Sequence, residues 1–550
     1  MSTAAEVLIE SLTAHRIDRM FCVPGESCLG LLDALHDSSI DTVVCRHEAG
    51  AGFMALADAR LTGRPGIACV SRGPGASNAA IAVHAAQQEG VPFVLLVGQV
   101  AARKLRRDSF QEIDCRGMFG SLAKWVGEVN DPDRIGEVLL RALRVATAGR
   151  CGPVVISLPE DVLAAGSHSR VVREQAVIRA APDARDLTTV RGWLAQAGKP
   201  LVISGTNLDS ATGRAMLRSF LERWNLPALV AFRSHDLFPN SHRLYAGELG
   251  LDNPAAQMAV LCESDLVLVL GAQLGDITTH GYSFPCRDDS RTRIVHVHPD
   301  CAVIGTHIAP DVAIACDACA FIEALGEPEA ITRHRSDNWT ERVKTEQLRA
   351  AAPPRALDVK DGLPFERVIE VVAGSLSPEA IVTLDAGAFA APVYRLVPFA
   401  PPQRLLAPVS GAMGFAVPAA VAAGLREPER QVLCLVGDGG FLMTGNELAV
   451  ASERRLPLKI IVSENRLYGS IRVQQERRYP GRAVATSFAN PDLELMGRAF
   501  GFNVTRIRSD AELKSLPQLL DRPRAEFVVI DTSVTAMLRA PVRDATAGAG

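Results

Sequence analysis

Short apolar runs alternate along the chain with longer segments that place apolar residues at helical spacing. The runs are too short for helices and suit buried strands. In the first third of the chain we expect strands at residues 19–23, 42–45, 66–70, 93–97 and 154–158. Strands that alternate with helices in this way predict a parallel sheet with helices on its faces, which is the α/β class.

The same alternation continues after two breaks, near residues 180–186 and 351–355. We therefore predict a first domain at 1–175, a central Rossmann-like domain at 186–345 and a third domain at 360–535. The third domain repeats the architecture of the first without visible sequence identity. The strands expected in the central domain lie at 200–204, 228–230, 265–270 and 293–297. The predicted fold is α/β, with a helix-flanked parallel sheet in each of three domains.

One unit of the third domain brings two polar side chains to one sheet edge. Asp438 comes shortly after the apolar run 432–436, and Asn465 comes shortly after a second apolar run, 458–462. A right-handed crossover makes two such strands parallel, so both side chains lie at the carboxyl edge, where open α/β sheets bind ligands. A carboxylate and an amide oxygen suit Mg²⁺, which completes its coordination with phosphate and water.

Glycines surround the acidic residue of this unit. Gly437, Gly439 and Gly440 let the backbone come close to phosphate oxygens, and the N-terminus of the following helix favours an anion. A turn of this kind is equally compatible with a plain connection between strand and helix. The asparagine after the second strand favours a magnesium diphosphate site.

Composition excludes several classes of partner. The chain has 550 residues and a net charge of -4, and no lysine-rich block or basic tail indicates nucleic acid or an anionic membrane. Glu6, Glu10 and Asp18 interrupt the N-terminal segment, so we expect no signal peptide. No apolar run approaches the length of a membrane span. We expect a cytoplasmic protein with neither a membrane nor a nucleic-acid partner.

The twelve cysteines are scattered, and many of them lie in apolar runs. We expect them to be buried free thiols. Cys316 and Cys319 form a CxxC pair, but no second pair completes a zinc site. A metal or redox role for that pair is therefore disfavoured.

The turn Gly437-Asp438-Gly439, followed at this distance by the segment from Asn465 to Gly469, resembles the thiamine diphosphate motif of the acetolactate synthase and 2-oxo-acid decarboxylase family. The resemblance implies that Asp438, Asn465 and the backbone carbonyl of Leu467 hold Mg²⁺. Further matches occur along the whole chain. They imply that thiamine diphosphate is bound by Pro24, Gly25, Glu48, Asn78, Gly387, Ala388, Phe389, Gly411, Met413, Gly437, Asp438, Gly439, Gly440, Asn465, Leu467, Tyr468, Gly469 and Ser470.

Two of these residues have roles that depend on their surroundings. Glu48 follows a predicted strand and opens a helix, where a carboxylate can simply complement the helix dipole. By resemblance, it contacts N1′ of the aminopyrimidine and so promotes removal of the thiazolium C2 proton. Met413 would lie between the two cofactor rings, with the Gly411 carbonyl at the 4′-amino group, although methionine also fills cores well. The segment from Gly73 to Asn78 resembles the GPGxxN turn of the family.

Other residues bear on the type of reaction. Phe110 and Gln111 resemble the FQE segment of acetolactate synthases, whose side chains line the pocket over the thiazolium, although a packed loop would look the same. Glu26 stands where decarboxylases carry an acid and acetolactate synthases usually carry glycine, so it is either an acid-base group or an exposed turn residue. The paired histidines of simple pyruvate decarboxylases are missing. These features favour ligation over plain decarboxylation.

Substrate selection and the central domain are less well defined. We expect substrate-selecting side chains after Tyr468, with Arg472, Gln475 and Glu476 as candidates. The central domain has no GxGxxG fingerprint, and FAD or ADP there is possible but not favoured. Leu274 stands where biosynthetic acetohydroxyacid synthases carry an arginine that helps to hold the second 2-oxo acid. That difference counts against a role in branched-chain biosynthesis.

The resemblance implies an enzyme that decarboxylates a 2-oxo acid such as pyruvate and ligates the product to an acceptor. The alternatives are a non-ligating 2-oxo-acid decarboxylase and an acyl-CoA lyase or decarboxylase of the same superfamily. The active site would lie between the first domain of one chain and the third domain of another. A homodimer is then the minimum assembly, and a homotetramer is favoured.

Overall fold

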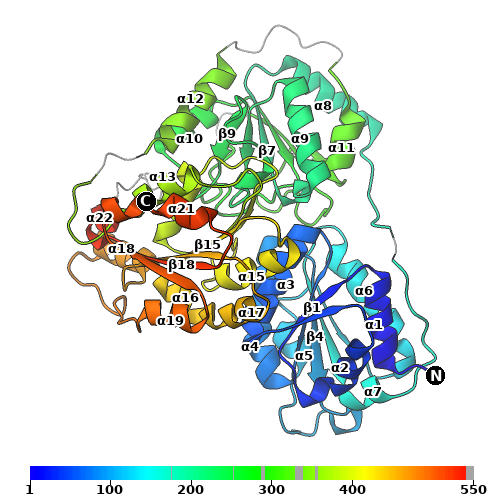
Figure 1. The fold of residues 1–550 in the computed structure, drawn as a ribbon. Helices are drawn as coiled ribbons and strands as arrows, with labels where there is room; N and C mark the ends of the chain where they lie inside the picture. The colour runs from blue at the N-terminus through cyan, green and yellow to red at the C-terminus, as the bar shows by residue number, and fades with distance from the viewer. Residues whose placement is uncertain (175, 252, 287–291, 329–337, 354–356, 540–550) are drawn as a thin grey trace.

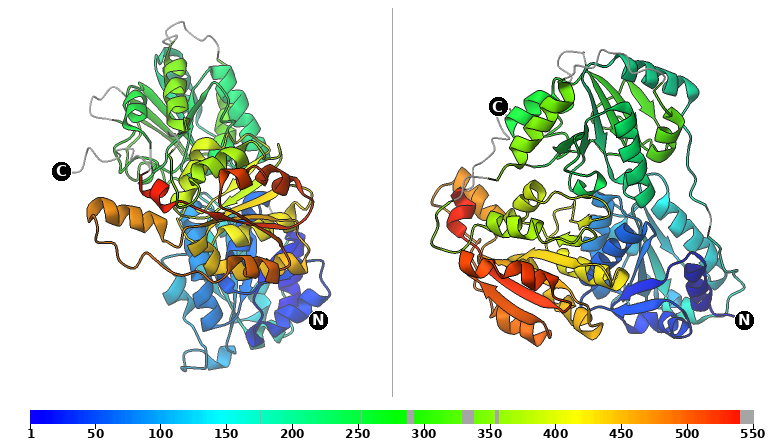
Figure 2. Two further views of the ribbon diagram at one scale, coloured as in Figure 1. Left: turned by 60° about the vertical axis from the view of Figure 1, so that its left-hand side comes forward. Right: turned by 45° about the horizontal axis from the view of Figure 1, so that its top comes forward.

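The computed structural model describes residues 1–174, 176–251, 253–286, 292–328, 338–353 and 357–539 (Figure 1). It holds three six-stranded sheets whose strand pairs are all parallel. Helices cover both faces of each sheet, which confirms the predicted α/β class. The blue first domain packs against the yellow-to-red third domain, and the green central domain lies over the pair (Figure 1, Figure 2).

The first sheet has the strand order β2-β1-β3-β4-β6-β5. Its strands are β1 (Arg19–Cys22), β2 (Asp41–Val44), β3 (Gly66–Val70), β4 (Phe93–Gln99), β5 (Trp125–Glu128) and β6 (Pro153–Pro159). Its helices are α1 (Ala4–Ala14), α2 (Leu29–His36), α3 (Glu48–Thr62), α4 (Gly73–Glu89), α5 (Cys115–Phe119), α6 (Ile135–Thr147) and α7 (Glu160–Ala164). Strand β5 was not predicted, because this edge strand is mostly half-buried and lacks a continuous apolar run.

The third sheet has the order β14-β13-β15-β16-β18-β17, so its strands are connected in the same sequence as those of the first. They are β13 (Ile381–Leu384), β14 (Arg404–Leu406), β15 (Val432–Gly437), β16 (Lys459–Glu464), β17 (Asn503–Ile507) and β18 (Glu526–Asp531). The helices are α13 (Phe365–Ala373), α14 (Ala391–Leu396), α15 (Ala416–Arg426), α16 (Asp438–Thr444), α17 (Leu448–Glu453), α18 (Gly469–Arg478), α19 (Leu493–Ala499), α20 (Asp510–Leu513), α21 (Leu516–Asp521) and α22 (Val534–Arg539).

The central sheet, followed from β9, has the order β9-β8-β7-β10-β11-β12, which is the Rossmann order 3-2-1-4-5-6. The strands are β7 (Pro200–Ser204), β8 (Ala228–Val230), β9 (Tyr245–Glu248), β10 (Leu266–Leu270), β11 (Arg293–Val297) and β12 (Val312–Ile314). The helices are α8 (Ala184–Gln196), α9 (Ala211–Trp224), α10 (Ala255–Leu261), α11 (Ala318–Leu325) and α12 (Trp339–Ala351).

The first and third domains share one hydrophobic core. Helix α3 of the first domain and helix α15 of the third are rich in alanine and glycine and are buried almost all round. A helix buried on every side packs between two layers, and small side chains allow close approach. The rings of Phe53 and Phe415 meet edge to face across this contact, with centroids 5.6 Å apart. The two domains are therefore joined rigidly within one chain.

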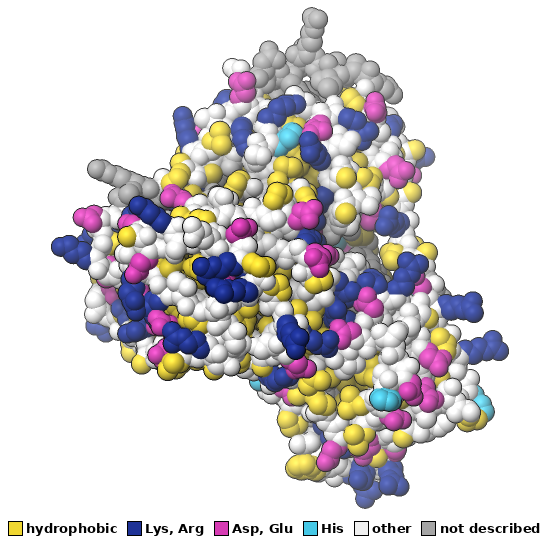
Figure 3. All heavy atoms as spheres, in the orientation of Figure 1, with side chains coloured by type: hydrophobic (Ala, Val, Ile, Leu, Met, Phe, Trp, Pro, Cys, Tyr) yellow, Lys and Arg dark blue, Asp and Glu magenta, His cyan; other side chains and the backbone are white. Residues whose placement is uncertain are grey.

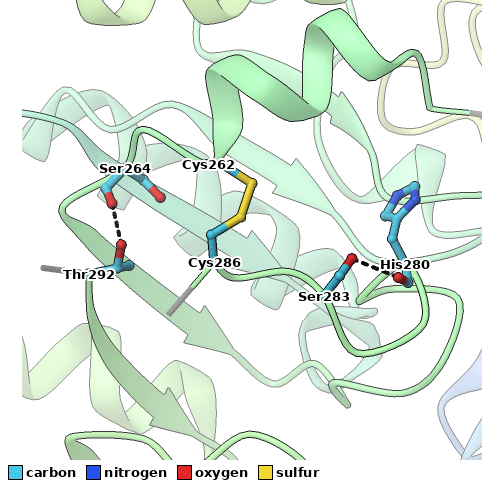
Figure 4. The surroundings of a disulfide bond; sticks show 6 residues. All are labelled: Cys262, Ser264, His280, Ser283, Cys286 and Thr292. Carbon is cyan, nitrogen blue, oxygen red and sulfur yellow. Dashed lines mark hydrogen bonds between the residues drawn. A yellow bond between two sulfur atoms is a disulfide. The ribbon is translucent and has the colours of Figure 1, made fainter. Parts of the chain in front are cut away.

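A disulfide links Cys262, at the end of α10, to Cys286 in the central domain (Figure 4). The expectation of free thiols was wrong for this pair, because two cysteines 24 residues apart in sequence carry no pattern that shows their proximity. It was right for Cys22, Cys28, Cys45, Cys69, Cys115, Cys316 and Cys434, which are free and buried. Cys151, Cys301 and Cys319 are free but not fully buried.

On the face drawn in Figure 3, basic and acidic side chains are interspersed over all three domains. Within the described ranges, no helix is both long enough and apolar enough to cross a membrane.

Candidate functional site

Asp438 lies where the sequence predicts it, at the carboxyl end of β15 and the start of α16, and it is only 2% exposed. Its Oδ2 accepts hydrogen bonds from the backbone N–H of Asn465 (3.1 Å), that of Arg466 (2.6 Å) and the Nδ2 of Asn490 (3.0 Å). Its Oδ1 accepts one from Gly439 N–H (2.9 Å). Burial raises the pKa of Asp438, and these donors oppose the rise. The carboxylate is thus held rigidly, with more donors on Oδ2 than on Oδ1.

Asn465 follows β16 at the same edge of the sheet. Its Oδ1 accepts from the N–H of Leu467 (3.0 Å), which folds the segment into a tight turn. The backbone N–H groups of Asn465 and Arg466 in this turn donate to Asp438. The Nδ2 of Asn465 lies 3.7 Å from the sulfur of Met537 in α22. The donor set of a carboxylate, an amide and a carbonyl oxygen fits Mg²⁺.

Aromatic side chains approach two glycines of the GDGG turn closely. A Cβ on Gly439 would lie 2.9 Å from the ring of Tyr468, and one on Gly437 would lie 3.1 Å from the ring of Phe389. These contacts bring three predicted cofactor segments together: the GDGG turn, the 387–389 turn and the 467–470 segment. Gly469 and Ser470 open α18 beside them.

Asp385 is a functional candidate that sequence reasoning missed. It is fully buried, and its carboxylate accepts from the N–H groups of Ala386 (2.7 Å), Gly414 (3.0 Å) and Ala416 (3.2 Å). Burial raises its pKa to about 6. The carboxylate therefore ties the 387–389 turn to the segment that carries Gly411 and Met413. No local motif signals this role, since the residues joined are about 30 apart.

In the first domain, Glu48 is the first residue of α3, as predicted. Its Oε2 accepts a hydrogen bond of 2.9 Å from the Nδ2 of Asn78. A Cβ on Gly75 would lie 3.3 Å from Glu48 Oε1, so the GPG turn passes directly beside this carboxylate. The structure thus brings together Glu48, Asn78 and the turn between them, which the sequence separates by a strand.

The remaining predicted residues of the first domain lie in the neighbouring loops of that domain. Gly25 approaches Ser71 so closely that a Cβ would lie 2.5 Å from the Cβ of that serine. Glu26 is exposed just beyond Pro24 and Gly25. The carbonyl of Gln111 accepts from Gly73 N–H (2.9 Å), so the FQE loop lies against the GPG turn, and Phe110 beside it is 80% exposed.

Glu447 is the second missed candidate. This residue of the third domain is fully buried, and its carboxylate accepts from the backbone N–H groups of Arg46 (3.1 Å) and His47 (2.9 Å), directly before α3. Burial raises the pKa of Glu447 to about 7, and the nearby charge of Glu48 adds to the rise. A side chain from one domain therefore fixes the segment that presents Glu48 in the other.

The two groups of predicted residues make no direct polar contact with each other in the described part of the chain. Among the described residues, no hydrogen bond or ion pair joins Glu48 or Asn78 to Asp438, Asn465 or Leu467. Exposed apolar side chains border both groups: Leu29 and Phe110 in the first domain, and Leu442, Met443 and Ile471 in the third. The two groups therefore lie in different domains, and exposed apolar side chains occur in the same domain as each of them.

The candidates for substrate selection are engaged in local contacts. Helix α18 and the loop after it extend away from the third domain (Figure 2). Arg472 donates to the hydroxyls of Thr486 (2.8 Å) and Ser487 (2.7 Å), and Gln475 donates to the Val484 carbonyl (2.9 Å). Glu476 accepts from Gly481 N–H. These side chains hold the loop against the helix.

In the central domain, Leu274 is buried. A cavity of about 10 Å³ lies beside it, lined in part by Gln273, His296 and Thr306. A volume of this size holds about one water molecule and is too small for an adenine or flavin ring.

Comparison with known proteins assigns each of the three domains. Residues 2–118 match the N-terminal TPP binding domain of thiamine pyrophosphate enzymes, residues 187–325 match the central domain, and residues 385–532 match the C-terminal TPP binding domain. The chain is 31% identical to the acetolactate synthase isozyme 1 large subunit of Escherichia coli, over 95% of this chain and 92% of the relative. It is 30% identical to the acetolactate synthase large subunit of Parasynechococcus marenigrum, over 96% of this chain and 87% of the relative. The predicted resemblance is confirmed: the chain belongs to the family of thiamine pyrophosphate enzymes that includes the acetolactate synthase large subunits.

Proposed function

We propose that the protein is a thiamine diphosphate-dependent and Mg²⁺-dependent carboligase, which decarboxylates a 2-oxo acid such as pyruvate and joins the product to an acceptor carbonyl compound. The observation that carries this proposal is the pair of half-sites. Glu48 with Asn78 lies in the first thiamine-binding domain, and Asp438 with Asn465 lies in the other. Relatives of near-equal length are named acetolactate synthases.

Each half-site has a distinct task. Asp438, Asn465 and the Leu467 carbonyl would hold Mg²⁺ against the diphosphate, at the N-terminus of α16, which favours the negative charge. When bound, thiamine diphosphate accepts the electrons released as carbon dioxide leaves. Glu48 would share a proton with the aminopyrimidine N1′, and Asn78 orients its carboxylate. The protein therefore binds, orients and moves one proton, while the cofactor supplies the difficult chemistry.

We further propose a homodimer at minimum, with a homotetramer favoured, in which the first domain of one chain meets the third domain of its partner. The location of the half-sites in different domains supports this arrangement, as do the exposed apolar side chains in each of these domains. Exposed apolar patches beside functional groups mark interaction surfaces. Sedimentation equilibrium would test it, and a fully active monomer would contradict it.

A specific feature supports the second candidate, an acyl-CoA lyase of the same superfamily. The loop before Phe110 carries four exposed cations: Arg103, Lys104, Arg106 and Arg107. Arginine and lysine recognise phosphates, which an acyl-CoA would bring to this site. A non-ligating 2-oxo-acid decarboxylase remains a third alternative, in which the product is released as an aldehyde.

The test is to incubate the purified protein with thiamine diphosphate, Mg²⁺ and a panel of 2-oxo acids, with and without acceptor aldehydes, 2-oxo acids and acyl-CoA thioesters. Carbon dioxide and carbon products are measured together. Carbon dioxide with a ligated hydroxyketone supports the carboligase, whereas carbon dioxide with free aldehyde supports the decarboxylase. Turnover of thioesters alone would replace the carboligase with the lyase. A flavin spectrum of the protein as purified tests FAD in the central domain.

A further inference from the structure

We propose that Asn490 is a positioning residue for the metal ion: it sets the Asp438 carboxylate so that Oδ1 faces the cation. This inference rests on the proposed function. Asn490 lies in a polar stretch between α18 and α19 that carries no predicted site residue. Its side chain nevertheless reaches the centre of the predicted metal half-site.

The hydrogen bonds at Asp438 are unequal. Oδ2 has three donors, from Asn465, Arg466 and Asn490, whereas Oδ1 has the adjacent N–H of Gly439 alone among the described donors. A carboxylate oxygen with three donors has little capacity left for a cation. Oδ1 keeps that capacity, and it is the oxygen on the side of the GDGG turn.

The three groups that donate to Asp438 Oδ2 come from different segments of the chain. The N–H groups of Asn465 and Arg466 belong to the segment that carries the other proposed ligands, so they move with it. Asn490 comes from a separate segment, 52 residues beyond Asp438. That segment pairs with the ligand segment, because Phe488 N–H donates to the Arg466 carbonyl (3.1 Å) and Tyr468 N–H donates to the Thr486 carbonyl (2.9 Å). The Asn490 side chain therefore ties the Asp438 carboxylate to this pair of segments.

The orientation of the Asn490 amide is itself fixed. The same Nδ2 donates to Oε1 of Glu464 at 3.0 Å, so the amino group lies between two carboxylates. Turning the amide over would point its oxygen at both of them. Glu464 is 7% exposed, and its Oε2 accepts from Arg506 at 2.6 Å. A relay thus runs from Arg506 on the edge strand β17 through Glu464 and Asn490 to Asp438.

The surroundings of the Asn490 amide oxygen also support a role in positioning the metal ion. Asn490 Oδ1 is buried and has no hydrogen-bond partner in the described part of the chain. Buried acceptors are rarely left unpaired, and Mg²⁺ usually keeps several water ligands. A water molecule of the metal shell would satisfy this acceptor.

The test compares Asn490→Leu, which keeps the number and branching of the side-chain heavy atoms and removes the hydrogen-bonding groups, with wild type. The control is Asn503→Leu, on β17 of the same domain, where an exposed asparagine donates to a backbone carbonyl. Mg²⁺ is titrated by calorimetry into each protein with thiamine diphosphate present. Groups that orient metal ligands typically contribute about 10–100-fold to metal affinity, so we expect a loss of this size for Asn490→Leu and none for Asn503→Leu.

A residue that positions the metal should raise the Mg²⁺ concentration needed for half-maximal activity while leaving kcat at saturating Mg²⁺ within a few-fold of wild type. If Asn490→Leu does not fold, as judged by circular dichroism, Asn490→Ala is tested in the same way, because its small side chain cannot clash. Wild-type Mg²⁺ affinity in the folded variant overturns this inference alone. If wild type itself binds neither Mg²⁺ nor thiamine diphosphate, the proposed function falls as well.

Discussion

Replacing Glu447 with glutamine tests how the third domain supports Glu48. The carboxylate of Glu447 is fully buried, and its pKa of about 7 lies above the ordinary value of 4.5. Since the folded pKa is raised, its contribution to stability is complete below pH 4.5 and is lost as the pH rises toward 7. Glutamine has nearly the shape of protonated glutamate and does not titrate.

The size of the effect follows from the two pKa values. Between pH 5 and pH 8, the titration of Glu447 should lower the unfolding free energy of wild type by about 2–3 kcal/mol relative to the Glu447→Gln variant. For a domain of this size, that difference corresponds to roughly 5–10 °C in Tm. We expect the two proteins to have similar Tm values at pH 5 and the variant to be the more stable at pH 8.

The assay is differential scanning calorimetry of the apoproteins at four pH values from 5 to 8. Comparing each variant with wild type cancels the titration of the other buried carboxylates, such as Asp385. The control is Glu453→Gln, since Glu453 is 56% exposed and also contacts Arg46. A difference between Glu447→Gln and wild type that stays constant with pH, as expected for the control, would refute the reasoning.

Three further predictions concern the half-sites. Glu48→Gln should lower kcat by about 10²–10⁴-fold, the usual contribution of a positioned proton-transfer group, while calorimetry still detects thiamine diphosphate binding; kcat within a few-fold of wild type would remove Glu48 from the proposed role. Asp438→Ala should abolish the rise in Tm that thiamine diphosphate and Mg²⁺ together produce in wild type, because the buried anionic ligand is lost; an undiminished rise would contradict the metal assignment. Gly439→Ala should weaken cofactor binding because the new Cβ would lie 2.9 Å from Tyr468 and push its ring away, whereas Gly192→Ala, where a Cβ meets nothing within 4 Å, should bind normally; equal affinities in the two variants would show that the turn tolerates the shift.

The sequence predicted most of the inner strands, because they are buried on both faces and are therefore continuous apolar runs. It missed β18, although this inner strand is buried as well. The run 432–436 corresponds to β15 and the run 93–97 to the first part of β4. Edge strands were harder to predict, since only one side of each is fully covered. The mixed burial of β5 and β17 leaves no continuous apolar run in either.

The site shows a similar division. Glu48, Asp438 and Asn465 lie where strands end, so the order of elements was enough to place them on a ligand edge. Asp385, Glu447 and Asn490 act through contacts that only the fold creates. Glu447 meets a backbone 400 residues away, and in the sequence it looks like an ordinary helix residue.

The central claim is that Glu48 of one chain and Asp438 of another serve the same cofactor. The most direct test co-expresses two inactive variants, Glu48→Gln and Asp438→Ala, so that mixed dimers form. The two variants carry different tags, which allow the mixed dimers to be purified. A mixed dimer would contain one site with both native residues and one with neither. Random pairing would then restore about a quarter of wild-type activity in the total pool, and about half in purified mixed dimers. Recovery of that size is the predicted result, and mixed dimers as inactive as the two parent variants would contradict a site shared between chains.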